Sequence, residues 1–271
     1  MMEDNYMLSL GKSVRLNRIL NKKSKKLIII TIDHPITRGM FPELVQMENT
    51  LEKIVEGGPD ALLMHKGIAE RFFYPHAGRI PLIIKATSFS PFHPTYDTWM
   101  TQADEAVRMG ADAISMGVIL GSTRQAEMLK NLGALSRDAA QSGLILMAHM
   151  YPKGELINDD ERFSLENLSY CARAGEELGV DVIKTWYPGD TDTFRKVCDV
   201  APGKVVAAGG AKTDTDEQLL QMAKGVMDSG ALGLAFGRNV WGHPNTAGII
   251  KALKAVVHDN KSVEEALEIL K

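Results

Sequence analysis

The chain has 271 residues, which is long for an ordinary domain but normal for a single α/β barrel. Hydrophobic residues make up 45% of the chain, so it can bury a large core. The formal net charge of −3 and the pI near 6.2 argue against nucleic-acid binding, because domains that bind polyanions carry a strong basic excess. We therefore expect a globular protein with small-molecule ligands.

Membrane insertion and secretion are not expected either. No apolar run approaches the roughly 20 residues that a membrane-spanning helix needs. Residues 1–5 are acidic and lack the basic-then-apolar order of a signal peptide. The two cysteines, Cys171 and Cys198, have no metal-binding or redox spacing and are expected to be small buried hydrophobes. These features predict a cytoplasmic location.

Eight short apolar runs recur along the chain. They cover residues 27–32, 61–64, 82–86, 113–116, 144–148, 182–185, 205–208 and 233–236. Continuous apolarity over such short lengths is typical of parallel strands that are buried on both faces. The segments between them place apolar residues three and four positions apart, which predicts amphipathic helices. The predicted helices cover residues 47–56, 98–109, 124–141, 164–178, 215–229 and 244–257, with additional helices at 12–20 and 263–270.

Glycines recur where a predicted helix passes into the next strand. Gly58, Gly110, Gly179 and Gly230 occupy such joints, and glycine can adopt the left-handed conformation that ends a helix. The repeated unit, without any linker of Pro, Ser and Gly, predicts one domain spanning residues 1–271. Its expected fold is a single (β/α)8 TIM barrel with an extra N-terminal helix. A doubly wound open sheet is the alternative.

The active site of such a barrel lies at the carboxyl ends of its strands. Gly209 and Gly210 follow the seventh run, and Gly237 and Arg238 follow the eighth. Glycines let backbone N–H groups approach an anion closely, and an arginine adds a charge-assisted partner. The two loops therefore predict a phosphate site for a small phosphorylated metabolite, although Gly209-Gly210 could simply form a tight turn.

Lys184 follows Val182-Ile183, so its side chain is expected at the barrel rim and partly buried. Burial disfavours the ammonium and lowers the pKa of a lysine, and neighbouring cations such as Lys153 or Lys212 would lower it further. A free amine beside a phosphate-anchored carbonyl can form an imine. From its position alone, Lys184 could equally be a phosphate ligand or an ion-pair partner.

Other polar residues follow neighbouring strands. Tyr151 could carry a proton if cations lower its pKa, or it could simply line the rim. Asp33 directly follows the first apolar run and cannot be buried there without a polar partner. It could contact substrate hydroxyls, relay a proton or support Lys184. Asp33, His65 and His149 could instead bind a metal in a barrel lyase or hydrolase. A phospho-sugar sensor without turnover is a third hypothesis.

Several motifs at predicted strand ends follow one another in a specific order. They are Leu10-Gly11-Lys12-Ser13-Val14-Arg15-Leu16, Asp33-His34, His65-Lys66-Gly67, Met150-Tyr151-Pro152-Lys153-Gly154, Ile183-Lys184-Thr185, Ala208-Gly209-Gly210-Ala211-Lys212-Thr213 and Gly237-Arg238-Asn239. With these motifs the chain resembles the archaeal-type class I fructose-bisphosphate aldolases and the related 2-amino-3,7-dideoxy-D-threo-hept-6-ulosonate synthases. The resemblance extends over about residues 11–270.

The resemblance implies a Schiff base on Lys184, with Tyr151 as proton donor and acceptor and Asp33 as an assisting acid. We expect the substrate and its phosphate to contact Gly209, Gly210, Lys212, Gly237, Arg238, His34 and Trp186. The implied reaction cleaves or forms a C–C bond in a phosphorylated ketose such as fructose 1,6-bisphosphate, with dihydroxyacetone phosphate as donor. A transaldolase that uses aspartate semialdehyde is the alternative. No cofactor or metal is implied, and relatives form homo-oligomers, often decamers.

Three departures from the family pattern concern the loops above the site. Pro35 follows His34 where relatives usually have glycine, and proline restricts both its own backbone and that of the preceding residue. Residues 85–91 replace a glycine-rich segment after the third strand. Trp186 and Tyr187 add bulk beside Lys184. These changes are expected to affect the choice of substrate more than the imine chemistry.

Overall fold

The computed structural model describes residues 9–271 and shows eight parallel strands closed into a barrel. The barrel strands are β1 (Leu27–Thr31), β2 (Ala61–His65), β3 (Leu82–Lys85), β6 (Ala113–Leu120), β7 (Ile145–Pro152), β8 (Val182–Trp186), β9 (Val205–Ala208) and β10 (Gly233–Phe236). They pair in the order β1-β10-β9-β8-β7-β6-β3-β2, and pairing of β2 with β1 closes the ring. All eight predicted strands are confirmed, and the open-sheet alternative is wrong.

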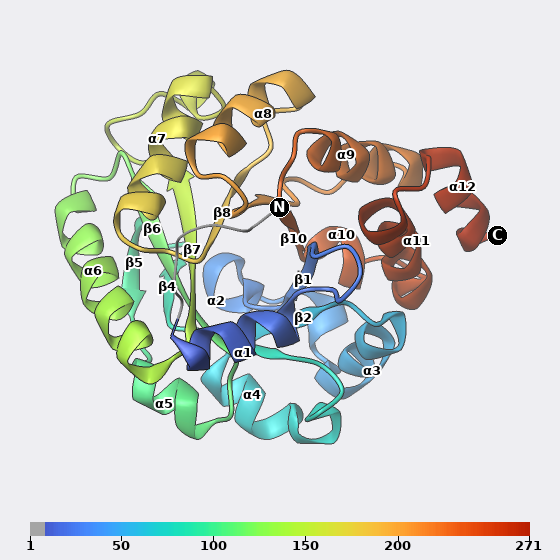
Figure 1. Ribbon diagram of the computed structural model, residues 1–271, viewed down its shortest axis with the longest axis horizontal. Coiled ribbons are helices and arrows are strands. Elements are labelled where there is room, and N and C mark those ends of the chain that lie inside the picture. Colours follow the sequence, from blue (N-terminus) through green and yellow to red (C-terminus); the bar gives the residue numbers. More distant parts are fainter. Residues whose placement is uncertain (1–8) are drawn as a thin grey trace.

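A ring of helices covers the outside of the barrel (Figure 1). It consists of α3 (Met47–Gly57), α4 (Lys66–Phe72), α5 (Ala103–Arg108), α6 (Gln125–Ser142), α7 (Leu165–Glu177), α8 (Thr191–Val200), α9 (Asp216–Asp228) and α11 (Thr246–Asp259). The remaining helices are α1 (Leu10–Ile19), α2 (His34–Arg38), α10 (Arg238–Trp241) and α12 (Val263–Leu267), with 3-10 turns η1 (Pro42–Leu44), η2 (Tyr74–His76), η3 (Asp159–Glu161) and η4 (Glu268–Leu270). The sequence patterns did not predict α4 and α8.

The glycines predicted at the helix-to-strand joints do adopt the left-handed conformation. Their φ angles are +68° at Gly58, +75° at Gly110, +73° at Gly179 and +88° at Gly230. Residues with a side chain rarely tolerate this conformation, so glycine lets each helix end and the chain turn at once into the next strand. This local rule explains why the strand starts were predictable.

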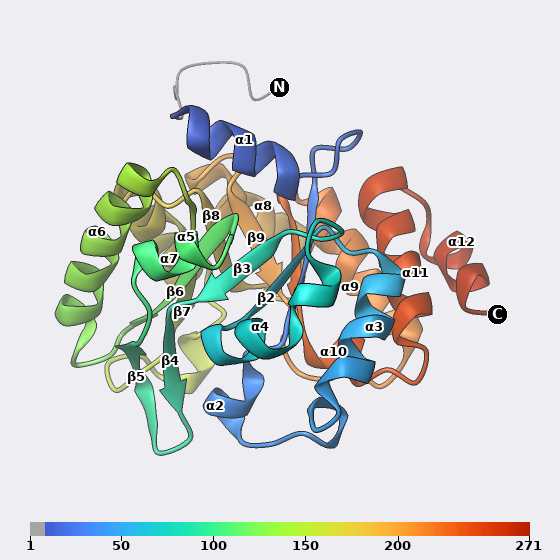
Figure 2. The ribbon, with the colours of Figure 1, turned by 90° about the horizontal axis from the view of Figure 1, so that it is seen from below.

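The predicted N-terminal helix is confirmed as α1, and it covers one end of the barrel. Figure 2 shows α1 at this end and α2 at the opposite end. The Lys12 Nζ of α1 lies 2.5 Å from Asp181 Oδ2, and Arg18 Nη1 lies 3.1 Å from Asp112 Oδ1. Both carboxylates come just before a barrel strand, so α1 closes the floor at the amino ends of the strands. Ile19 of α1 is buried with the residues that fill the barrel interior.

An antiparallel hairpin follows β3 and was not predicted. It consists of β4 (Thr87–Ser90) and β5 (His93–Trp99), and it lies at the end of the barrel that carries α2 (Figure 2). The helix predicted for residues 98–109 is therefore partly wrong, because Thr98 and Trp99 belong to β5 and α5 begins only at Ala103. Hairpin pairing overrode the helical spacing of the apolar residues at this point.

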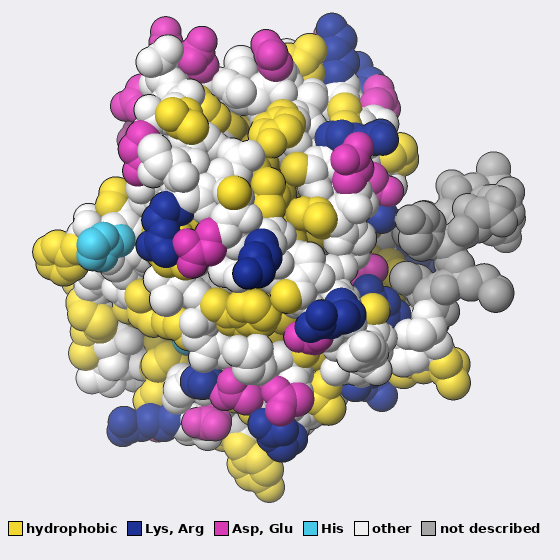
Figure 3. All heavy atoms as spheres, turned by 90° about the vertical axis from the view of Figure 1, so that its left-hand side faces the viewer, with side chains coloured by type: hydrophobic (Ala, Val, Ile, Leu, Met, Phe, Trp, Pro, Cys, Tyr) yellow, Lys and Arg dark blue, Asp and Glu magenta, His cyan; other side chains and the backbone are white. Residues whose placement is uncertain are grey.

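The surface agrees with the modest net charge of the chain. On the face that carries α5, α6 and the hairpin, acidic and basic side chains are interspersed and hydrophobic ones lie between them (Figure 3). Within residues 9–271, no helix combines the length and apolarity needed to cross a membrane. The signal-peptide argument concerned residues 1–5, which lie outside the described part of the chain.

Candidate active site

A cavity of about 430 Å³ opens at the carboxyl ends of the barrel strands. Most of the substrate-contacting residues predicted from the sequence line it: Asp33, His34, Tyr151, Lys184, Trp186, Gly209, Gly210, Gly237 and Arg238. Lys212 is the exception, because its side chain is exposed and does not line the cavity. The barrel therefore brings the predicted lysine and the two glycine-containing loops to one site.

Strand alternation explains why these side chains point inward. In β8, Val182 belongs to the barrel interior and Ile183 packs against the outer helices. Successive side chains of a strand point to opposite faces, so the next residue, Lys184, points into the barrel mouth. In β7 the same alternation carries Met147 and Tyr151 to the inner side. The functional side chains thus form the top layer of the barrel core.

Lys184 is only 5% exposed, and its surroundings favour the free amine. Burial is the main cause that lowers the pKa of Lys184 to about 8. The carboxylate of Asp33 opposes this shift, and the ammonium of Lys85 adds to it. About a tenth of Lys184 is therefore uncharged at pH 7, far more than of an ordinary lysine, and the free amine is the form that a nucleophile requires.

Asp33 and His34 form a second polar group beside Lys184. Burial alone would raise the pKa of Asp33, but the positive charges of His34 in its protonated form, of Lys184 and of Lys85 outweigh it and lower the pKa. Burial lowers the pKa of His34 to about 4, although Asp33 opposes this change. Asp33 is thus a carboxylate and His34 a neutral imidazole near pH 7, with Nδ1 of His34 3.5 Å from Asp33 Oδ1. His34 begins the short helix α2, with Asp33 at the position just before it and Pro35 as its second residue.

Tyr151 is held between aromatic neighbours at the mouth of the cavity. Its ring stacks on Trp186, with centroids 5.1 Å apart and an angle of 23° between the rings. The ring of Phe163 in turn lies against Trp186, with centroids 5.2 Å apart. Burial raises the pKa of Tyr151, and Asp33 and Asp97 raise it further. The condition named for proton transfer by Tyr151, a pKa lowered by cations, is therefore not met, because burial and carboxylates dominate its surroundings. Tyr151 is a neutral phenol that can donate a proton.

The two predicted phosphate loops are joined to each other. Arg238 Nη2 donates to the Gly210 carbonyl oxygen at 2.7 Å, and Asn239 Nδ2 donates to the Gly209 and Ala211 oxygens at 2.9 and 3.0 Å. Gly210 has a φ of +61°, which favours glycine. At Gly237, a Cβ atom would lie 2.8 Å from the Thr31 oxygen, so a side chain there would collide with β1. Asn239 organises the loop after β9, a role that its place in the motif did not reveal.

Two residues of the cavity, Lys85 and Asp97, were not predicted to act in it. Lys85, Asp97 and His149 are buried and line the cavity beside Lys184. Lys153 also lines it, with its Nζ 3.7 Å from the centre of the Phe89 ring, and burial lowers the pKa of Lys153 to about 8. One signal was available in the sequence: a lysine inside an apolar strand is rarely buried without a partner. Asp97 could not be found because its hairpin was not predicted.

The three proposed metal ligands do not come together. His65 does not line the cavity, and its Nδ1 lies 3.2 Å from the Lys85 oxygen. His149 Nε2 lies 2.9 Å from Ser115 Oγ. Within the described residues, no group of three His, Cys, Asp or Glu side chains is arranged to hold a metal ion. The arrangement of side chains therefore does not support the metal-dependent alternative.

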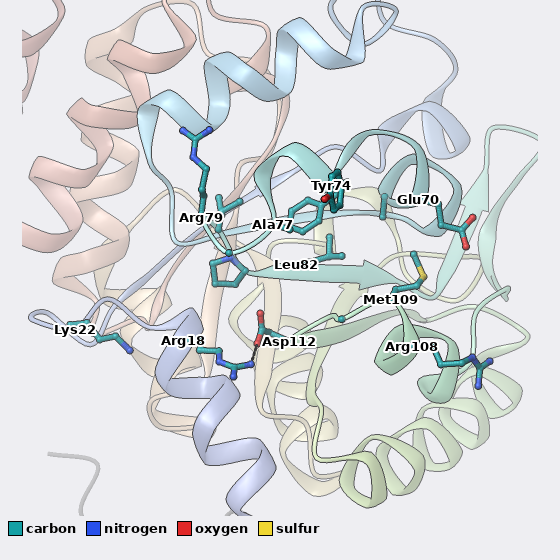
Figure 4. A pocket seen from close by; sticks show the side chains of 16 residues that line it. Arg18, Lys22, Glu70, Tyr74, Ala77, Arg79, Leu82, Arg108, Met109 and Asp112 are labelled. Carbon is teal, nitrogen blue, oxygen red and sulfur yellow. Dashed lines mark hydrogen bonds and ion pairs between the residues drawn. The ribbon is translucent and has the colours of Figure 1, made fainter.

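A larger hollow of about 850 Å³ lies at the other end of the barrel, beside α1 (Figure 4). Its polar side chains do not converge. Arg18 points to Asp112, whereas Arg79 and Arg108 point away from each other (Figure 4). A hollow at the amino ends of the strands contributes to the floor of a barrel, whereas catalysis occurs at the carboxyl ends. The smaller cavity is thus the candidate active site.

Comparison with known proteins identifies the family. The family model described as DeoC/LacD family aldolase matches residues 27–243. The chain belongs to this family. The 2-amino-3,7-dideoxy-D-threo-hept-6-ulosonate synthase of Halobacterium salinarum is 35% identical over 96% of the chain and 97% of that protein. The class 1 fructose-bisphosphate aldolase of Thermoproteus tenax is 33% identical over 93% of the chain and 97% of that protein.

Solved structures agree with this assignment to the DeoC/LacD family. An archaeal fructose 1,6-bisphosphate aldolase is 31% identical and superposes with a TM-score of 0.84 over 92% of the chain and 99% of that structure. A structure of the Schiff-base-forming fructose-1,6-bisphosphate aldolase, solved to analyse its reaction intermediates, has the same TM-score and identity over 91% of the chain. This member of the family is an aldolase or transaldolase. The resemblance drawn from the motifs is confirmed.

Proposed function

We propose that this enzyme is a class I aldolase in which Lys184 forms an imine with the ketone of a phosphorylated ketose. The observation that carries the proposal is the position of Lys184. Its amine is buried, has a pKa lowered to about 8, and lines the same cavity as the Gly210 and Arg238 loops. An amine in this state, in one cavity with loops that can bind an anion, has what imine formation requires.

The phosphate of the substrate binds at the loops after β9 and β10, where Arg238 supplies a positive charge. This contact places the ketone over Lys184, and such positioning contributes several kcal/mol to lowering the barrier. The amine nitrogen attacks the ketone carbon, so a C–N bond forms and the carbonyl oxygen leaves as water after protonation. The resulting iminium is the electron sink that accepts the electron pair when the neighbouring C–C bond breaks.

Tyr151 and Asp33 assist this chemistry. The phenol of Tyr151 is neutral and held by its stack on Trp186, so it can donate a proton, and the phenolate that this leaves beside the cationic iminium can accept one back. Asp33 remains a carboxylate beside Lys184 and stabilises positive charge on the nitrogen through the reaction. His34 completes this side of the cavity as a neutral hydrogen-bonding group.

The substrate that we propose is a ketose phosphate of the fructose 1,6-bisphosphate type, with dihydroxyacetone phosphate as the donor half. The names of the Thermoproteus tenax relative and of the archaeal structures support this choice. The name of the Halobacterium salinarum relative supports a second candidate, a transaldolase that transfers the donor to aspartate semialdehyde. Both reactions would use an imine on Lys184, and they differ in the acceptor and in the ketose that supplies the donor half.

The enzyme is proposed to act in the cytoplasm as a homo-oligomer, a decamer by analogy with the resembling family. The assembly can be measured by size-exclusion chromatography with light scattering. A mass of about 30 kDa, that of one chain, would contradict self-association.

Reductive trapping tests the central claim. The protein is treated with borohydride and either fructose 1,6-bisphosphate or dihydroxyacetone phosphate, and peptides are analysed by mass spectrometry. A stable adduct is expected on Lys184 alone. Lys184→Ala should give no adduct although Lys85 and Lys153 remain, and Tyr151→Phe should still give one. Turnover assays with glyceraldehyde 3-phosphate and with aspartate semialdehyde then separate the two acceptors. Turnover without any adduct would refute the proposal.

A further inference from the structure

Next to the hairpin β4–β5, a second buried lysine lines the cavity. Lys85 is the last residue of β3, and the chain then turns directly into β4. Lys85 is 3% exposed and lines the cavity with Asp97 of β5. The mechanism described above assigns no contact with substrate to either residue.

Thr87 holds this lysine and its carboxylate in fixed positions. Its hydroxyl donates to Asp97 Oδ1 at 2.6 Å and accepts from Lys85 Nζ at 3.2 Å and from the Gly117 backbone N–H at 2.7 Å. A threonine hydroxyl offers one donor and two acceptor positions, so all of them are used. At Gly117, a Cβ atom would collide with the Asp97 carboxylate, so the backbone of β6 is shaped around this group. Residues of four strands, β3, β4, β5 and β6, therefore fix the positions of Lys85 and Asp97.

The ammonium of Lys85 nevertheless retains hydrogen-bonding capacity. It carries three N–H donors, and the described residues provide one hydrogen bond, to Thr87, and one ion pair, to Asp97 Oδ1 at 3.8 Å. Buried donors without acceptors are costly, and a group left in this condition at a cavity wall indicates a ligand oxygen. Lys85 lines the cavity in which a substrate would lie.

The position of β3 in the barrel indicates which half of the substrate Lys85 would contact. Three strands lie between β3 and β9 in either direction around the ring, so Lys85 lies across the barrel from the loop that carries Gly209 and Gly210. Lys184 on β8 lies next to that loop. A ketose held by its phosphate at β9 and by its ketone at Lys184 extends toward the β3 side, where the acceptor aldehyde is released or enters.

We propose that Lys85, held by Thr87 and Asp97, is a specificity-determining residue that donates a hydrogen bond to an oxygen of the acceptor half of the substrate. This inference rests on the proposed aldolase function and extends it. It assigns the acceptor a class: a hydroxylated or anionic aldehyde whose oxygen reaches the ammonium. The hairpin is thus a part of the active site that selects the acceptor, whereas β8, β9 and β10 bind the donor.

Lys85 also influences the titration of the donor side, and this gives an independent readout. The charged or titratable groups that face it are Asp97, Asp33, His65, His149 and Lys184. Its ammonium lowers the pKa of Lys184. Removing that charge should shift imine formation to higher pH, whereas a merely structural defect would lower activity without moving the pH profile.

The test separates the donor from the acceptor. In Lys85→Met, the rate of borohydride trapping with dihydroxyacetone phosphate alone is measured well above pH 8, where Lys184 is uncharged in both proteins. It should match the wild type. The KM for the acceptor that supports turnover should rise roughly tenfold or more, as expected for loss of a charge-assisted hydrogen bond. Lys85→Arg should restore part of the acceptor affinity.

Lys85→Met leaves the buried Asp97 without its cation, so folding needs its own control. The double variant Lys85→Met with Asp97→Asn removes both charges at nearly constant volume, and it should show the same rise in the KM for the acceptor. An unchanged KM in either folded variant would overturn the role of Lys85, as would equal losses for donor and acceptor. Absence of any adduct in the wild type would instead overturn the aldolase proposal itself.

Discussion

At the scale of single residues, the reactivity of the site depends on the charge of one amine. Lys184 is buried, and this burial competes with the attraction of the Asp33 carboxylate for the ammonium form. The balance leaves the pKa of Lys184 at about 8. One shifted pKa unit corresponds to about 1.4 kcal/mol, so each neighbouring charge has a measurable effect on the fraction of free amine.

This balance predicts the pH dependence of imine formation. The ammonium form of Lys184 cannot attack a ketone, so the rate of trapping with dihydroxyacetone phosphate should rise with pH and level off above about 8. Asp33 raises the pKa of Lys184, and Asp33→Asn should therefore move the rising limb to lower pH. The position of the limb, and not its height, is the measured quantity. A limb near 10.5, the ordinary value for lysine, or a shift of Asp33→Asn to higher pH, would contradict this account.

At the scale of elements, α1 is attached to the barrel by a buried ion pair. The side chains of Lys12 and Asp181 are only 9% and 11% exposed, and Asp181 Oδ2 also accepts from the Leu146 N–H at 2.8 Å. The carboxylate therefore joins α1 to the starts of β7 and β8. Removing one partner of such a pair leaves a buried charge without compensation, which costs more than the pair itself contributes.

Lys12→Met should accordingly lower the free energy of unfolding by about 3 kcal/mol. Arg18→Met is the matched control on the same helix. The Arg18 side chain is 60% exposed although it pairs with Asp112, so its loss should cost about 1 kcal/mol or less. Urea denaturation followed by circular dichroism measures both values. Equal losses in the two variants would show that burial of the Lys12 pair is not what fastens α1.

At the scale of the whole molecule, the barrel joins distant segments into one ligand site, so binding should stabilise the entire fold. Dihydroxyacetone phosphate at about 100 times its Kd should add about 2.7 kcal/mol to the free energy of unfolding. This raises the Tm by several degrees for a chain of this size. Thermal denaturation with and without the ligand measures the shift.

Two arginine variants locate the binding site in this measurement. Arg238→Met should lose most of the ligand-induced rise in Tm, because Arg238 belongs to the phosphate loops. Arg79→Met alters the hollow at the opposite end of the barrel and should keep the full rise. A rise that is lost with Arg79 and kept without Arg238 would place the phosphate at the floor and contradict the proposed site.

Much of this architecture could be predicted from the chain because it depends on local signals. Short apolar runs become buried parallel strands wherever they occur, and Gly58, Gly110, Gly179 and Gly230 end helices through their own backbone freedom. Strand alternation then carries Lys184 and Tyr151 to the inner face. The fold and the residues on the donor side of the site therefore followed from patterns within a few positions of each residue.

The proposed acceptor side of the cavity followed only from the closed structure. Asp97 reaches the cavity through a hairpin whose strand pairing overrides the helical spacing of its apolar residues. The neutral state of Tyr151 depends on burial and on carboxylates from other elements, which no neighbouring residue in the chain reveals. Lys212, a close neighbour of Gly209 and Gly210 in sequence, points to solvent, whereas Lys85, more than 120 positions before them, lines their cavity. Burial and electrostatic fields are properties of the assembled barrel, because each sums over groups that only chain closure brings together.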